Sequence, residues 1–290
     1  MKQPAGPDGL AVIDKPAGWT SHDVVAKLRG VLGTRKVGHA GTLDPDATGV
    51  LLVGVGRATR LMRFMTALPK TYVGEIVLGS ETNTLDASGE VTATHDMSGV
   101  TLEAARAAAV NLTGAIEQVP PMVSAVKVGG RRLHELAREG IEIERDARPV
   151  TVHRFDLFDG PEAGVLRAEV ECSSGTYIRT LAADLGHLLG GGAHLRNLRR
   201  TAIGSFTLDE ATTIEAASPL PMVEALRDLS QVTVDDDVAA LVRNGRVLDL
   251  DALGVSGDPP WPLVATDGSL LAVYEPVADG RAKPTVVIPS

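Results

Sequence analysis

The chain has 290 residues, a length that predicts one large domain with a smaller appendage. Its content of 44% apolar and 22% charged residues is typical of a globular protein, and no apolar stretch is long enough to cross a bilayer. The first seven residues lack the apolar core of a secretory signal, and a single cysteine excludes an internal disulfide. We therefore expect a cytoplasmic protein with no membrane contact.

The net charge of −9 disfavours a polyanionic partner at first sight, but the charge is unevenly distributed. Residues 201–290 hold 5 Lys or Arg against 14 Asp or Glu, whereas residues 1–200 hold 23 of each kind. The first 200 residues can therefore carry basic patches, although each patch taken singly is better explained as a solvated surface. The candidate patches are Arg29/Arg35/Lys36, Arg57/Arg60/Arg63, Lys127/Arg131/Arg132 and Arg196/Arg199/Arg200.

Strand-like and helix-like segments follow one another along the first two thirds of the chain. Thr20-Ser21 caps a helix whose apolar residues recur at helical spacing until Gly33. The other expected helices cover residues 58–65, 101–112 and 177–189. The expected strands cover residues 10–14, 50–55, 72–78, 150–157 and 165–172. Cys172 ends the last of these alternating runs, so we interpret it as a buried structural cysteine.

Two regions differ in character from this pattern. Residues 119–121, Val-Pro-Pro, break any helix, and the segment that continues to about Pro149 predicts an inserted, exposed subdomain with two short elements around residues 129–132. Two prolines at 219 and 221 mark a linker, after which short β-like pieces follow. Asp267-Gly268 supplies the turn between two apolar strands, so a small C-terminal β domain is expected.

Asp44 is the carboxylate whose setting is most informative. Because Pro45 disfavours helical dihedrals at the preceding residue, Asp44 is expected to be extended on a loop. Small residues around it allow a ligand to approach closely. From these residues alone, however, Asp-Pro-Asp over 44–46 is best explained as a surface turn.

A resemblance to a known family changes that interpretation. Residues 38–52, Gly-His-Ala-Gly-Thr-Leu-Asp-Pro-Asp-Ala-Thr-Gly-Val-Leu-Leu, resemble the nucleophile motif of bacterial TruB-type tRNA pseudouridine synthases. That family converts the T-loop uridine of tRNA, at position 55, to pseudouridine. Further family motifs recur in family order, at Asp14–Ser21, Lys70–Tyr72, Gln118–Pro121, Ser124–Lys127, Gly175–Gly186 and Leu198–Thr201. The resemblance covers about residues 9–210.

The resemblance implies an α+β fold with a mixed, largely antiparallel central sheet flanked by helices and an active site in a central cleft. It implies a catalytic domain over residues 1–220, with an RNA-contacting insertion at about 120–149. Residues 229–290 would form a PUA-like β domain, although their acidic composition suits phosphate binding poorly. Val123 and His134 stand where tyrosines are common in the insertion of the family.

Site residues carried over from the family match this sequence position by position. Asp44 is the implied nucleophile, and Arg179 is implied to lie beside it and keep it charged. Tyr72 would stack on the displaced base and help to remove the C5 proton, although as a residue it fits a core strand equally well. Leu198 would form an apolar wall of the pocket. His39 would fill the space left when the uridine flips out of its stack.

The residues leave the chemical route open between attack of Asp44 at ribose C1′ and attack at uracil C6. No cofactor or metal is implied. The seven histidines show no metal-ligand spacing, and the glycines around Gly54-Val-Gly56 lack the third glycine of a dinucleotide site.

Alternative functions are a guide-RNA-dependent pseudouridine synthase and an RNA chaperone that folds tRNA with catalysis secondary. A glycosidase using Asp44 and Asp46 is a third, disfavoured alternative. The leading hypothesis is an enzyme that acts on the T arm of tRNA and needs no obligatory protein partner.

Overall fold

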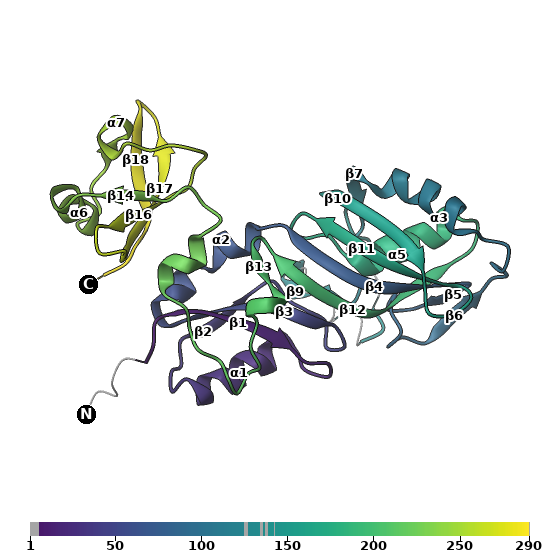
Figure 1. The fold of residues 1–290 in the computed structure, drawn as a ribbon. Coiled ribbons are helices and arrows are strands. Elements are labelled where there is room, and N and C mark those ends of the chain that lie inside the picture. The colour runs from purple at the N-terminus through teal and green to yellow at the C-terminus, as the bar shows by residue number, and fades with distance from the viewer. Residues whose placement is uncertain (1–5, 125–126, 134–135, 137–138, 142, 290) are drawn as a thin grey trace. The chain divides into compact units, whose positions relative to one another are not determined.

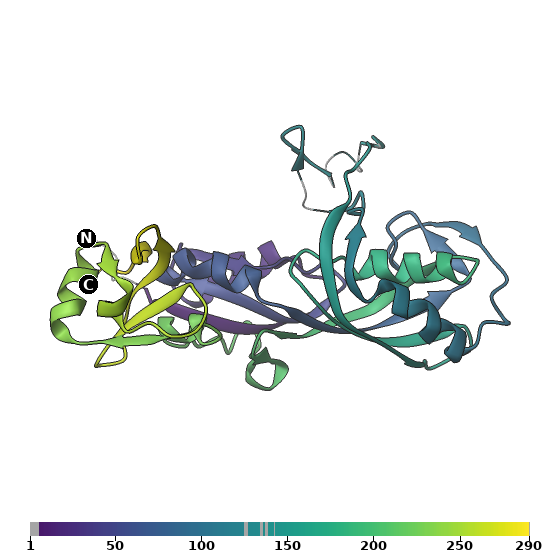
Figure 2. The ribbon, with the colours of Figure 1, turned by 90° about the horizontal axis from the view of Figure 1, so that it is seen from above.

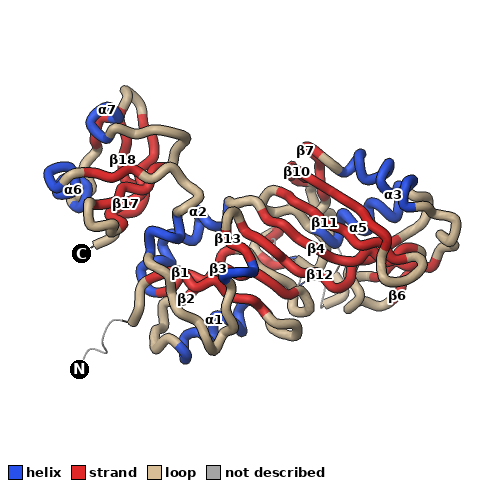
Figure 3. Tube along the Cα trace, in the orientation of Figure 1, coloured by secondary structure: helices blue, strands red, loops and turns tan. Residues whose placement is uncertain are grey.

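The computed structural model describes residues 6–124, 127–133, 136, 139–141 and 143–289 (Figure 1). The chain divides into two compact units, of which unit 1 comprises Met1–Pro45, Gly49–Ala67 and Ile203–Ser290, and unit 2 comprises Asp46–Thr48 and Leu68–Ala202. Strands and loops dominate both units (Figure 3). No helix in these described ranges is long and apolar enough to cross a membrane.

The N-terminal part of unit 1 is built on three antiparallel strands with helices on both faces. Its elements are β1 (Gly9–Lys15), α1 (Ser21–Val31), β2 (Val37–Ala40), β3 (Thr48–Val55), the 3-10 helix η1 (Gly56–Leu61) and α2 (Met62–Ala67). β3 pairs with both β1 and β2. Val24, Val25 and Leu28 of α1 pack against alternate residues of β1 and β3 in one buried cluster. On the other face, a Cβ at Gly54 would lie 2.6 Å from Met62 Sδ of α2 and 3.1 Å from the backbone of Ala58 in η1, so both helices pack closely against this glycine.

The C-terminal part of unit 1 contains a five-stranded sheet in the order β14-β16-β17-β18-β15. Its elements are β14 (Val232–Val234), α6 (Asp236–Arg243), β15 (Leu248–Asp249), α7 (Leu250–Leu253), β16 (Trp261–Ala265), β17 (Leu270–Val277) and β18 (Arg281–Val287). Tyr274, Trp261 and Leu263 are buried in its core with apolar residues of α6 and α7. The segment before it holds β13 (Phe206–Thr207) and the 3-10 helices η3 (Leu208–Glu210) and η4 (Met222–Leu226).

Unit 2 is built on five neighbouring strands in the order β12-β4-β11-β10-β7. These are β4 (Lys70–Leu78), β7 (Gly114–Gln118), β10 (Arg148–Asp159), β11 (Val165–Cys172) and β12 (Ala193–Ile203). β11 pairs antiparallel with β4 and β10, and β10 pairs antiparallel with β7. Residues 70, 72, 74 and 76 of β4 alternate into the buried face, opposite the buried residues 172, 170, 168 and 166 of β11. The remaining elements are β5 (Ser80–Thr82), β6 (Val91–Thr94), α3 (Leu102–Ala109), the 3-10 helix η2 (Val110–Leu112) and α5 (Ile178–Leu188).

The segment between β7 and β10 stands out from the strands that carry it (Figure 2). Its base is the pair Gln118 and Arg148, the first residues matched in the β7–β10 ladder. Its described residues include a short hairpin of β8 (Lys127–Val128) and β9 (Arg131–Arg132). Gly129 and Gly130 both have positive φ, as a two-residue hairpin turn requires. His134, one of the two positions at which the chain departs from the family pattern, lies outside the described residues.

The α+β class predicted from the sequence is confirmed, and most expected elements exist with shifted ends. The expected helix over 58–65 is a 3-10 helix that continues as α2, and the expected helix over 101–112 ends as an α-helix at Ala109 and continues as η2. The turn at Asp267-Gly268 is longer than a tight two-residue turn, since Ala265 N–H donates to the Ser269 carbonyl at 2.9 Å. Strands β2, β5, β6 and β7 were not predicted, because they are short or lack clear alternation.

Candidate active site

The loop that carries Asp44 runs from the end of β2 to the start of β3, and its residues up to Pro45 belong to unit 1. Asp44 is half-buried and lies outside any helix or strand, between buried Leu43 and exposed Pro45. Gly41 enters this loop with a φ of 84°, a conformation that favours glycine. The surface turn that the residues alone favoured is therefore only partly correct, because the loop packs its apolar residues inward while leaving Asp44 partly accessible.

Both neighbours of Asp44 are held by buried side chains. The Ser21 hydroxyl accepts a hydrogen bond from Leu43 N–H at 2.9 Å and donates to the Leu43 carbonyl at 3.2 Å. The Lys15 ammonium donates to the Pro45 carbonyl at 2.9 Å, and the same oxygen accepts from Gly18 N–H at 2.9 Å. The side chains of Ser21 and Lys15 are both fully buried. The backbone is thus fixed on each side of the carboxylate.

Lys15 and Ser21 belong to a segment that the sequence analysis matched to the family without assigning either residue a role. Lys15 also donates to the carbonyls of Pro16 at 2.9 Å and Trp19 at 2.5 Å, so its buried charge is surrounded by carbonyl oxygens. A buried lysine is unusual in a protein and signals a specific role. The spacing of Lys15, Ser21 and Asp44 along the chain gave no sign that they meet.

His39 lies on β2, opposite Val53 of β3, and its side chain is half-buried. The exposed ring of His22 on α1 stands edge-to-face to it, with ring centroids 5.3 Å apart and planes at 80°. His39 thus lies on the strand that precedes the Asp44 loop. In the described residues no group of three or more His, Cys, Asp or Glu side chains could hold a metal ion.

Tyr72 and Leu198 lie on the same face of the sheet of unit 2. Tyr72 is 8% exposed on β4, and Gly74 follows on the same face. A Cβ built on Gly74 would lie 3.4 Å from Leu198 Cδ1 of β12, which places Leu198 over that face. Asn197 has a φ of 52°, and this left-handed residue interrupts the regular alternation of β12 just before Leu198. The structure therefore brings these two predicted residues together.

Arg179 lies in the first turn of α5, where its side chain is only 5% exposed. Its guanidinium donates to the carbonyl of Thr84 at 2.8 Å and to the carbonyl of Val123 at 2.7 Å. It also forms an ion pair with Asp86, at 3.5 Å between Nη1 and Oδ2. The helix-surface arginine that the residues alone would suggest is excluded, because this guanidinium is buried in a network of oxygen atoms.

Asp86 also belongs to this network, although it lies outside the family motifs named above. Its other oxygen, Oδ1, accepts from the Thr84 hydroxyl at 2.7 Å and from the Ser88 hydroxyl at 2.6 Å. Leu85, directly before it, has a φ of 63°, which is uncommon for a residue with a side chain. The sequence does mark this aspartate, because residues 84–86 are Thr-Leu-Asp, the same tripeptide as residues 42–44. Asp44 and His39 belong to unit 1 and the other predicted site residues to unit 2, so the pairing of Asp44 with Arg179 stays a prediction.

Most arginines of the predicted basic patches have partners within the protein. Arg57 binds Asp8 at 2.6 Å, Arg63 lies 3.5 Å from Glu275, and Arg196 binds Glu75 and Glu162, each at 2.6 Å. Arg200 is 1% exposed. The side chains of Lys127 and Arg132 lie outside the described residues. By contrast, the residues of the cluster Arg29, Arg35 and Lys36 are all exposed, at the end of α1 and beyond it.

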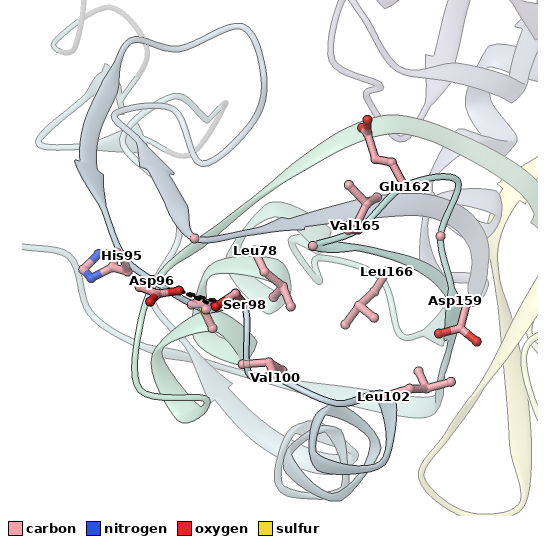
Figure 4. A pocket seen from close by; sticks show the side chains of 15 residues that line it. Leu78, His95, Asp96, Ser98, Val100, Leu102, Asp159, Glu162, Val165 and Leu166 are labelled. Atoms are coloured by element: carbon pink, nitrogen blue, oxygen red, sulfur yellow. Dashed lines mark hydrogen bonds between the residues drawn. The ribbon is translucent and has the colours of Figure 1, made fainter.

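A cavity of about 750 Å³ in unit 2 contains none of the predicted site residues (Figure 4). Its floor is apolar, and Asp96, Asp159 and Glu162 lie around it. Carboxylates in these positions disfavour a phosphate-bearing ligand. The cavity therefore does not extend the candidate active site.

Comparison with known proteins gives consistent matches over nearly the whole chain. A model of the TruB family pseudouridylate synthase N-terminal domain matches residues 29–178, and one of the tRNA pseudouridylate synthase B C-terminal domain matches residues 179–228. The chain is 48% identical to the tRNA pseudouridine synthase B of Arthrobacter sp. (strain FB24), with 96% of each chain covered. It is 46% identical to the same enzyme of Streptomyces griseus subsp. griseus, with 99% of each chain covered.

A solved structure described as a Cbf5-Nop10-Gar1 complex has the same fold, with a TM-score of 0.74 and 26% identity. The match covers 97% of this chain and 85% of that chain.

Proposed function

Because this chain belongs to the TruB family of pseudouridylate synthases, we propose that it converts the T-loop uridine of tRNA, position 55, to pseudouridine with Asp44 as the nucleophile. The observation that carries the proposal is the anchoring of the Asp44 loop. Ser21 binds the residue before Asp44 and Lys15 binds the residue after it, while Asp44 as a residue is half-buried. A catalytic group needs such a fixed backbone and an accessible functional atom.

The reaction is an isomerisation with no net oxidation. In one route, an Asp44 oxygen attacks ribose C1′ as the bond from C1′ to uracil N1 breaks, and uracil leaves as an anion. The base rotates, C5 attacks C1′, and the bond from Asp44 to C1′ breaks. The proton on C5 is lost and N1 gains a proton. In the other route, an Asp44 oxygen adds to uracil C6, the bond from C1′ to N1 breaks and C5 bonds to C1′; the bond from Asp44 to C6 then breaks, C5 loses its proton and N1 gains one. The proposal leaves both routes open.

Each remaining site residue has a proposed task in this reaction. Arg179 stabilises the ionised form of Asp44, and Asp86 holds the guanidinium through the ion pair at 3.5 Å. Tyr72 stacks on the displaced base and assists removal of the C5 proton, and Leu198 walls the same face. His39 fills the space that the flipped uridine vacates. The exposed cations Arg29, Arg35 and Lys36 supply the positive potential that binds the phosphates of the T arm.

The proposal includes the remaining parts of the chain. The five-stranded sheet over residues 229–290 is a PUA-like appendage to a catalytic domain over residues 1–220. Residues 120–149 contact the RNA, and the enzyme works in the cytoplasm.

The test is release of tritium from an isolated T-arm stem-loop that carries tritium at uridine C5. We expect wild-type protein to release it and Asp44→Asn to release none. Asp46→Asn is the matched control, because Asp46 is an exposed carboxylate of the same loop and should retain activity. No release by wild-type protein, from either the stem-loop or full-length tRNA, would refute the proposal. Loss of activity in Asp46→Asn alone would move the nucleophile to the other carboxylate.

The same wild-type and variant proteins distinguish two alternative functions. If Asp44→Asn supports tRNA maturation as fully as wild type, the protein acts chiefly as a tRNA chaperone. If wild-type protein releases tritium only when a guide RNA and protein partners are added, it is a guide-dependent enzyme. Activity on the stem-loop alone contradicts the guide-dependent alternative, and loss of tRNA maturation in Asp44→Asn contradicts the chaperone alternative.

A further inference from the structure

Gln118 is a buried polar residue to which the proposed reaction gives no task. It is the last residue of β7, directly before the segment that projects from the sheet, and only 2% of its surface is exposed. Its Oε1 accepts a hydrogen bond from the backbone N–H of Tyr177 at 2.9 Å, and its Nε2 donates to the carbonyl of Tyr177 at 3.2 Å. One amide side chain therefore binds both backbone groups of a single residue 59 positions away.

Tyr177 is the residue from which α5 begins. Its own side chain makes no capping hydrogen bond, and its carbonyl also accepts the first helical hydrogen bond, from Leu181 N–H at 3.1 Å. The start of a helix normally needs an added partner to fix it. Gln118 supplies that partner from a neighbouring strand. The two hydrogen bonds from Gln118 thus fix the position at which α5 begins relative to β7.

Arg179 lies two residues after Tyr177, within this first turn. Its guanidinium donates to the Val123 carbonyl at 2.7 Å, and Val123 is five residues after Gln118. The stretch from Gln118 to Val123 therefore contacts α5 twice, once at its backbone start and once at the guanidinium. These two contacts fix both ends of the arginine.

Gln118 carries no charge and so acts on the position of Arg179 rather than on the local potential. Its burial excludes water as a substitute for the two hydrogen bonds, so their loss leaves Tyr177 free to shift. A displacement of about 1 Å in a group that acts on the transition state lowers a rate by as much as ~100-fold.

We propose that Gln118 is a positioning residue of the isomerisation, which sets the place of the Arg179 guanidinium by clamping the backbone of Tyr177. The proposal rests on the function proposed above for Arg179. It assigns to the Gln-Val-Pro-Pro motif a role in catalysis in addition to any role in carrying the projecting segment.

The test measures the single-turnover rate at saturating tRNA together with the dissociation constant of the tRNA. Gln118→Met keeps the length of the side chain and removes both hydrogen bonds. We expect its rate to fall by about 10- to 100-fold while the dissociation constant stays within about threefold of wild type. Gln231→Met is the control, because Gln231 is exposed in unit 1 and its rate should not change.

A second variant separates positioning from a general loss of structure. Gln118→Glu keeps the acceptor for Tyr177 N–H but, when ionised, places a carboxylate against the Tyr177 carbonyl. A protonated carboxyl can donate to that carbonyl, so the rate of Gln118→Glu relative to wild type should rise as the pH falls from 8 to 6. If Gln118→Met does not fold, the inference is tested with Gln118→Glu.

A wild-type rate in a folded Gln118→Met, a rate loss explained entirely by weaker tRNA binding, or a pH-independent defect in Gln118→Glu would each overturn the inference. The variant Arg179→Ala distinguishes failure of the inference about Gln118 from failure of the function proposed for Arg179. If Arg179→Ala turns over at the wild-type rate, the proposed function of Arg179 is wrong. If Arg179→Ala loses its activity and the Gln118 variants do not, only the inference about Gln118 fails.

Discussion

Replacing Ser21 with alanine tests whether the backbone before Asp44 must be held. The substitution removes one oxygen atom, and with it the hydrogen bonds to Leu43 N–H at 2.9 Å and to the Leu43 carbonyl at 3.2 Å. Ser21 is fully buried, so water cannot take the place of the hydroxyl. The N–H and carbonyl of Leu43 then lose this partner in a buried setting.

The expected loss of stability follows from these two hydrogen bonds. A hydrogen bond contributes about 0.5–1.5 kcal/mol net, and a buried group left unsatisfied costs about 1–3 kcal/mol. We therefore expect Ser21→Ala to lower the free energy of unfolding by roughly 2–4 kcal/mol. The single-turnover rate should fall by about 10- to 100-fold, because Leu43 adjoins the proposed nucleophile. Binding of tRNA should change little, since the hydroxyl faces the protein interior.

The neighbouring residue supplies a matched control. The Thr20 hydroxyl caps α1 by accepting from Asp23 N–H at 3.0 Å, and it donates to Asp23 Oδ2 at 2.6 Å. Thr20→Ala should lower stability by about 0.5–2 kcal/mol and leave the rate unchanged. The assay is tritium release under single-turnover conditions, with unfolding followed by denaturant. The reasoning is refuted if Ser21→Ala is as active as wild type, or if both variants lose rate in proportion to their loss of stability.

Two further predictions follow from buried titratable groups in unit 2. Burial raises the pKa of Cys172 to about 11, so iodoacetamide at pH 8 should modify this single thiol at least about 100-fold more slowly in the native protein than in denaturant; equal rates would contradict its burial. Burial, together with the nearby charge of Arg200, lowers the pKa of Lys70 from 10.5 to about 8. Between pH 8 and pH 10.5 the unfolded state therefore binds more protons at Lys70 than the folded state does. Stability relative to Lys70→Met should therefore rise, by on the order of 1–3 kcal/mol, as the pH increases from 8 to 10.5, and a flat difference in denaturant midpoints would contradict this.

Local features of the sequence predicted much of the fold. The helix that starts after Thr20 is visible as a polar cap followed by apolar residues at helical spacing, and the structure adds a reciprocal capping box with Asp23. The alternation that ends at Cys172 predicted a half-buried strand and a buried thiol, both of which the structure has. These signals work because capping and periodicity involve residues within a few positions of one another.

The identities of the candidate site residues came from resemblance rather than from periodicity. Taken alone, Asp44 favoured a turn and Tyr72 fitted a core strand. Family motifs supplied roles for them, and the structure then showed that Tyr72 and Leu198 share one face of the sheet. The roles themselves stay predictions until they are tested.

The tertiary structure alone decided which side chains support those residues. Ser21 meets Leu43 across 22 positions, Gln118 meets Tyr177 across 59, and Arg179 meets the Thr84 carbonyl across 95. Such contacts depend on strand order and on the path of each loop, so no local pattern encodes them. The helix caps, the alternating strands and the family motifs could be recognised from the sequence, because each involves residues close together in the chain. Only the folded chain determined that Lys15, Ser21 and Gln118 hold the groups proposed for catalysis.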